Sequence, residues 1–77
     1  MNELARRIYE NRDEYNRLFI ELANKFKEPN SGLLENTRSV EIDNLLKSIN
    51  VVKSNLQTLE AVEVYLNEED KRLYGNG

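Results

Sequence analysis

The chain contains no cysteine and no histidine, and these two absences exclude much of the chemistry by which small proteins act. A disulfide framework, a zinc site built from cysteine and histidine, and catalysis through a thiolate or an imidazole are all ruled out. The histidine-containing di-iron sites of helical bundles are ruled out for the same reason. We therefore expect a protein that is not an enzyme and that uses no cofactor or metal.

Helix-breaking residues are also scarce, with 3 glycines and 1 proline among 77 residues. The high share of charged residues (32%) beside 39% hydrophobic residues favours long helices over a disordered tail. No run of about 18 apolar residues is present, and the first residues lack the basic-then-apolar pattern of a secretory signal. We therefore expect a cytoplasmic protein that does not cross a membrane, and the lack of cysteine fits that compartment.

The one strong interruption of the chain is Pro29-Asn30-Ser31-Gly32. Proline lacks a backbone N–H and disfavours a helical conformation in the residue before it, so a helix should end just ahead of this segment. The sequence predicts one all-α domain with a helix over about 2–28 and a second over about 38–74. The two should fold as an antiparallel helical hairpin.

Apolar residues in the first segment recur at helical spacing. They are Leu4, Ile8, Tyr15, Leu18, Phe19, Leu22 and Phe26. At about 100° per residue they fall within one arc, which we expect to face the second helix. Asn11 and Arg12 interrupt the arc, either to set the register or as hydrated residues at its edge. Tyr9, Ile20 and Ala23 widen it beyond what one facing helix can cover.

The second segment follows a seven-residue repeat of the coiled-coil type. Its apolar positions are Ile42, Leu45, Ile49, Val52, Leu56, Leu59, Leu66 and Leu73. Glu63 and Asp70 are the departures from the repeat. Such a repeat keeps one seam facing a partner helix. Leu46 and Val62 widen the seam, which suits a four-helix bundle made by two copies of the hairpin.

Residues with capping side chains mark the expected helix ends. Asn2 is the predicted N-cap of the first helix, and Ser39 that of the second, with Thr37 as the alternative. Asn67 and the acidic residues after it could also cap a separate short third helix over 67–74. The pattern alone leaves both arrangements of this last segment open.

Paired carboxylates are the only catalytic option that the composition leaves. Glu10 and Asp13 are three residues apart on the first helix, and Glu60 and Glu63 are three apart on the second. Carboxylates at this spacing share a helix face and can hold Mg²⁺ together with a phosphate substrate, as in all-α nucleotide hydrolases. Such spacings are common in any acidic helix, so a solvated face is the favoured interpretation.

Arginines near the start of the first helix raise the alternative of a nucleic-acid-binding hairpin dimer. Arg6, Arg7 and Arg12 would be its contacts. Acidic residues interleave with them at spacings that favour ion pairs along the helix. The net charge of −3 also opposes broad attraction to phosphates.

The favoured function is non-catalytic protein–protein interaction, as a small adaptor, an accessory subunit or a regulator of a larger complex. The expected partners are a second copy of the chain, a larger protein, or both. The apolar residues expected to make the contact are Tyr9, Ile20, Tyr65, Leu66 and Leu73. The two tyrosines are candidates because they lie off the main seams and because tyrosine is enriched in binding hot spots.

Overall fold

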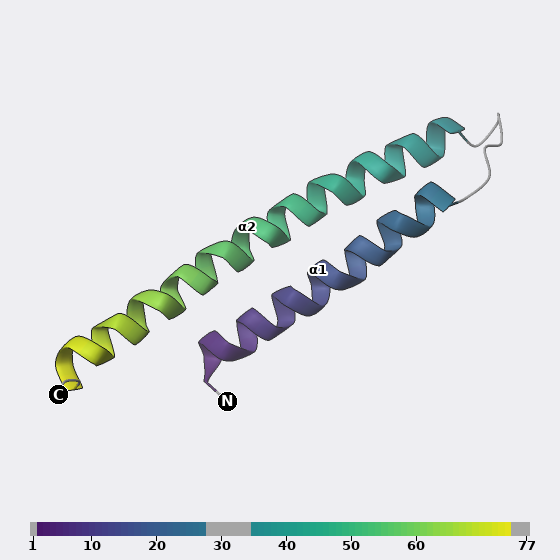
Figure 1. The fold of residues 1–77 in the computed structure, drawn as a ribbon. Coiled ribbons are helices and arrows are strands. Elements are labelled where there is room, and N and C mark those ends of the chain that lie inside the picture. Colours follow the sequence, from purple (N-terminus) through teal and green to yellow (C-terminus); the bar gives the residue numbers. More distant parts are fainter. Residues whose placement is uncertain (1, 28–34, 75–77) are drawn as a thin grey trace.

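The computed structural model describes residues 2–27 and 35–74. These residues form two antiparallel helices, α1 (Glu3–Lys27) and α2 (Glu35–Tyr74), which lie side by side as a hairpin (Figure 1). The molecule is a rod with extents of 66 × 18 × 17 Å. The predicted all-α helical hairpin is therefore confirmed, whereas the turn predicted at 29–32 falls outside the described residues.

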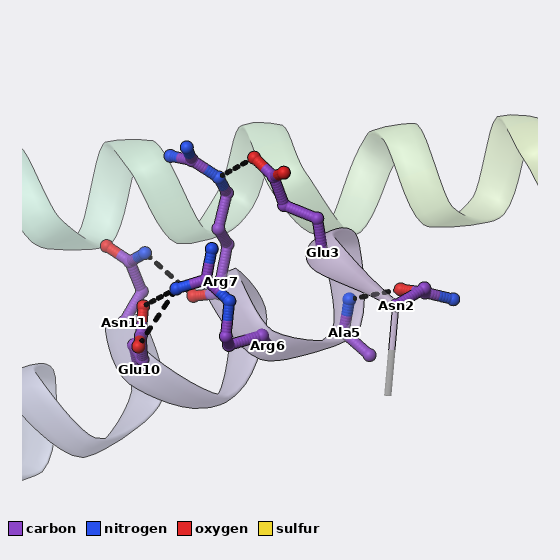
Figure 2. A network of polar contacts seen from close by, with 7 residues as sticks. All are labelled: Asn2, Glu3, Ala5, Arg6, Arg7, Glu10 and Asn11. Carbon is purple, nitrogen blue, oxygen red and sulfur yellow. Dashed lines mark hydrogen bonds and ion pairs between the residues drawn. The ribbon is translucent and has the colours of Figure 1, made fainter.

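The start of α1 is capped as its sequence predicts. The backbone N–H of Ala5 donates to Oδ1 of Asn2 at 2.7 Å (Figure 2). The N–H of Arg6 donates to the backbone carbonyl of Asn2 at 3.1 Å. The first bond satisfies one of the backbone donors that every helix leaves unpaired in its first turn. Glu3, in the first turn, places a carboxylate at the positive end of the helix dipole.

The structure corrects the predicted start of α2, and it decides between the two arrangements left open at its end. The helix begins at Glu35, so Ser39 and Thr37 lie inside its first turns and neither is the N-cap. It also runs without a break to Tyr74, so residues 67–74 are not a separate third helix. Neither proline nor glycine interrupts the chain between 35 and 74. Within the last turns, Arg72 and Glu69 form an ion pair at 2.6 Å, a spacing that supports a continuous helix.

Contacts between the helices set the register of the hairpin. Arg12 of α1 and Glu60 of α2 form an ion pair at 2.8 Å. Ala5, seven residues before Arg12, lines a shallow hollow together with Asn67, seven residues after Glu60. Lys25 and Glu41 form a second ion pair between the helices, near the opposite end of the rod. These three contacts fit one antiparallel alignment along the whole length of α1.

The buried core is small. Among the described residues only Ile8, Leu18 and Ile49 are buried apolar residues, and each keeps a few per cent of its surface exposed. The other seam residues that retain partial exposure include Leu4, Leu22, Ile42, Leu45, Val52, Leu56 and Leu59. Two helices cover each other along one line only, so each residue beside that line keeps contact with solvent. The hairpin therefore buries little of the apolar surface that its sequence supplies.

Phe19 and Phe26 do not face α2 as their place in the apolar arc predicts. Their exposed fractions are 56% and 66%. The seam of α1 instead continues through the polar residues Asn11 and Lys25, which are half-buried. These two residues lie seven positions on either side of the buried Leu18, and that spacing keeps all three on one line of the helix. Phe19 and Phe26 each follow a seam residue by one position and are turned about 100° away from it.

Candidate partner-binding surfaces

One side of the hairpin is marked by the ion pair between Arg12 and Glu60. Residues seven apart on a helix lie nearly above one another, so each of these two residues belongs to a line along its helix. The line on α1 is Ala5, Arg12, Phe19 and Phe26, and the line on α2 is Leu46, Lys53, Glu60 and Asn67. Ala5 and Asn67 line one hollow, which confirms that the two lines run side by side. We call this the apolar side.

An apolar shelf covers the part of this side nearest the connection between the helices. It consists of Phe19, Ala23 and Phe26 of α1 and Leu46 of α2, all of them exposed. The register that pairs Arg12 with Glu60 places Phe26 opposite Leu46. The ring of Phe19 stacks on that of Tyr15, with centroids 6.4 Å apart and planes inclined by 20°. The sequence pattern did not predict this shelf, because the apolar arc placed both phenylalanines in the core. The seven-residue line through Asn11, Leu18 and Lys25 is the sequence feature that places the phenylalanines outside the core.

The opposite side, which we call the polar side, is hollowed and rich in polar residues. Its shallow hollows are lined by residues that include Arg7, Glu14, Glu21, Lys47, Ser48 and Asn55. Ser48 and Asn55 are short side chains on one seven-residue line of α2, so they fill less of the groove between the helices than leucine would. The half-buried Asn11 also lies here, and its side-chain amide donates to the backbone carbonyl of Arg7 at 2.8 Å (Figure 2).

The five residues predicted to contact a partner are all exposed, but they do not form one patch. Tyr9 and Ile20 lie on α1, and Ile20 borders the apolar shelf in the helical register. Tyr65, Leu66 and Leu73 lie near the end of α2, and we call these three residues the tail face. Figure 1 shows α2 continuing past the start of α1 at this end of the rod.

The tail face is exposed because the seam of α2 changes character beyond Val62. Glu63 and Asp70 occupy positions where the earlier repeat has isoleucine or leucine, and both are exposed. Glu63, Leu66 and Asp70 line a hollow together with residues of the first turn of α1. Acidic side chains are favourable there because the N-terminal end of a helix carries partial positive charge. Leu66 shares this hollow with Leu4 and Ala5 but remains 46% exposed, and Leu73 is 62% exposed.

The arginines predicted to contact nucleic acid are paired with carboxylates in the hairpin. The pairs are Arg6 with Glu10 at 3.2 Å, Arg7 with Glu3 at 2.8 Å, and Arg12 with Glu60 at 2.8 Å; the first two are drawn in Figure 2. The three arginines also occupy three different lines of the helix and do not form one basic face. Pairing and dispersion both weaken the local attraction that a phosphate backbone would need.

Arg17, the remaining arginine of α1, is held in the same way. Its guanidinium lies 2.5 Å from a carboxylate oxygen of Glu14 and 3.9 Å from one of Glu21. The hydrogen bond to Glu14, followed by the charge of the same carboxylate, raises the pKa of Arg17 above its ordinary value. Arg17 thus stays charged, and its charge on the polar side is balanced by neighbouring carboxylates.

The four carboxylates considered for magnesium binding do not gather into one site. Glu10 pairs with Arg6, and Glu60 pairs with Arg12 across the hairpin. Within 2–27 and 35–74, no group of three or more carboxylates lies close enough together to hold a metal ion. Within the described part of the chain, the four carboxylates therefore do not assemble the magnesium site that such a hydrolase would need.

Neither α1 nor α2 has a stretch that is long and apolar enough to cross a membrane. Comparisons of the chain with protein families, with curated proteins and with solved structures find no match. The surfaces just described are therefore the basis for any assignment of function.

Proposed function

We propose that this protein is a non-catalytic protein–protein interaction module, acting in the cytoplasm as a small adaptor, accessory subunit or regulator of a larger complex. The observation that carries the proposal is the imbalance between exposed and buried apolar residues. Within the described part of the chain, three large apolar residues are buried and twelve are exposed. Exposed apolar surface that is concentrated in patches is typical of an interaction site.

The tail face is the surface proposed to bind the larger protein. Leu66 and Leu73 are seven residues apart, and Val62 precedes Leu66 by one turn, so all three can enter one groove. Helix-in-groove recognition uses anchors at this spacing. Tyr65 beside them supplies a large apolar ring with a polar tip, the combination that is frequent in binding hot spots. A second copy of the chain is proposed to cover a different surface, the apolar shelf.

The test compares two variants as baits in quantitative capture from the native host. In the tail variant, Leu66→Ser and Leu73→Ser are combined. In the matched control, Val40→Ser and Val51→Ser are combined, because these valines are 58% and 61% exposed and belong to neither proposed surface. We expect a protein that the wild-type chain and the control recover in equal amounts, and that the tail variant recovers at least about tenfold less.

The captured protein is then purified, and its binding to each variant is measured by titration. Binding that is lost with the tail variant and kept with the control supports the proposal. Equal affinity for the tail variant and the wild-type chain would overturn the assignment of the tail face. Circular dichroism of the unbound variants checks that both retain the helical content of the wild-type protein.

A further inference from the structure

We infer that the apolar shelf binds the same shelf of a second copy of this chain, so that two hairpins pack antiparallel around a two-fold axis. The inference rests on the self-association included in the proposed function and specifies which surface performs it. Phe19, Ala23, Phe26 and Leu46 form the centre of the interface. The tail face and the polar side stay outside it.

The accessible surface of the hairpin is larger than a stable monomer of its mass normally keeps. The structure exposes 6207 Å². A compact monomer of 9.0 kDa exposes about 4,900 Å², so the surplus is about 1,300 Å². A standard specific interface buries about 800 Å² on each partner. One shelf-to-shelf interface therefore accounts for a large part of the surplus, which matches the shape expected of half of a four-helix bundle.

The shelf has the form that a second hairpin requires. It spans both helices, since Phe26 of α1 lies opposite Leu46 of α2 in the register set by Arg12 and Glu60. A surface two helices wide is covered best by another pair of helices, as in a four-helix bundle. In an interface with two-fold symmetry the same patch occurs on both partners, and its central residue lies closest to the axis. Ala23, between Phe19 and Phe26, is that residue, and its small side chain allows the helices to approach.

Charges around the shelf are complementary under the same symmetry. Ala23 lies at about the level of residues 48–49 on α2, so a two-fold axis there brings the level of Lys53 in one copy to within about 3 Å of the level of Asp43 in the other. Both residues are exposed, and both lie on the apolar side in the seven-residue register. Lys53 of one copy thus comes to the level of Asp43 of the other copy at each end of the shelf. At these two levels the interface therefore pairs opposite charges.

The test measures solution mass by light scattering across a concentration series of the purified chain. The wild-type chain should rise from 9.0 kDa toward twice that mass. Combined Phe19→Ser and Phe26→Ser should weaken the dimer by at least about a hundredfold, because exposed aromatic anchors dominate such interfaces. The Val40→Ser and Val51→Ser control should dimerise like the wild type. A wild-type chain that is monomeric throughout, or a shelf variant that dimerises as well as the control, would overturn the inference.

A second measurement locates the interface without removing any aromatic residue. Because the chain has no cysteine, single cysteines can be placed at Ala23 on the shelf or at Ser48 on the polar side. Ala23→Cys should form disulfide-linked dimers faster than Ser48→Cys under the same mild oxidation. Equal rates would overturn the shelf as the interface. Failure here leaves the tail face and its capture experiment untouched, so the two proposals can fail separately.

Discussion

The two sides of the hairpin are built from the same two helices, yet they differ in what they leave exposed. The apolar side carries Phe19, Phe26 and Leu46 beside the seam, whereas the polar side carries Glu14, Glu21 and Ser48 at the corresponding positions. On both sides an ion pair joins the helices, Arg12 with Glu60 on the apolar side and Lys25 with Glu41 on the polar side. The polar side shows that the two helices pack beside charged and small residues as well as beside large apolar ones. The polar side also exposes Val51 and Val62. The gathering of the two phenylalanines on the apolar side is what points to association.

The largest expected effect separates two neighbouring residues, Leu18 and Phe19. Leu18 is 7% exposed and Phe19 is 56% exposed. Leu18→Ala should destabilise the hairpin by about 3 kcal/mol at any protein concentration, because it leaves a cavity in a core of few buried residues. Phe19→Ala should lower the melting temperature only at concentrations at which the wild-type chain is a dimer. Thermal unfolding followed by circular dichroism at low and high concentration provides the measurement.

The outcome that would contradict this comparison is equal destabilisation by the two substitutions at low concentration. Phe19 would then belong to the core of the monomer, and the distinction between seam and shelf would be wrong. A decrease in melting temperature that depends on protein concentration for Leu18→Ala but not for Phe19→Ala would reverse the assignment of the two residues.

A smaller effect is expected when the polar side is made apolar. Asn11 is half-buried at a seam position, and its amide bonds only to the backbone of its own helix. Asn11→Leu should raise the stability of the hairpin by about 1 kcal/mol through added apolar burial. It should also weaken the control of register that a polar seam residue provides. Melting temperature and solution mass test both parts; a lower melting temperature would show that the amide contributes more than leucine burial.

Reversing one charge beside the shelf should change the dimer affinity by about tenfold or less. Asp43→Lys places a second cation opposite Lys53 of the other copy and should weaken the dimer. Adding Lys53→Asp restores opposite charges and should restore the affinity. Sedimentation at low and moderate salt measures the change, which should shrink as salt screens it. If the double variant dimerises as weakly as the single variant, the proposed position of the two-fold axis is wrong. The assignment of the shelf as the interface would not be affected.

Much of the fold is predictable from the sequence because helical periodicity and helix breakers are local features. The two helices follow from apolar spacing and the scarcity of glycine and proline, and the cap at Asn2 follows from its amide. The start of α2 cannot be predicted in this way. Ser39 and Thr37 are good caps only where the residue before them is not helical. The shelf is also not predictable from apolar residues alone: the polar Asn11 and Lys25 occupy the seam, so Phe19 and Phe26 are displaced from it. Separating the shelf from the core requires knowing which seven-residue line of α1 packs against α2.

The smallest expected effect compares the two ion pairs that join the helices. Arg12 and Glu60 lie on the apolar side, and Lys25 and Glu41 lie on the polar side. Double-mutant cycles with alanine should give coupling energies of about 0.2–1 kcal/mol for each pair in dilute monomer, since the charges remain hydrated. At concentrations that favour the dimer, only the coupling of Arg12 with Glu60 should change, because the second copy packs beside that pair and lowers its access to water. Equal coupling of this pair at both concentrations would show that the dimer covers no more than the shelf.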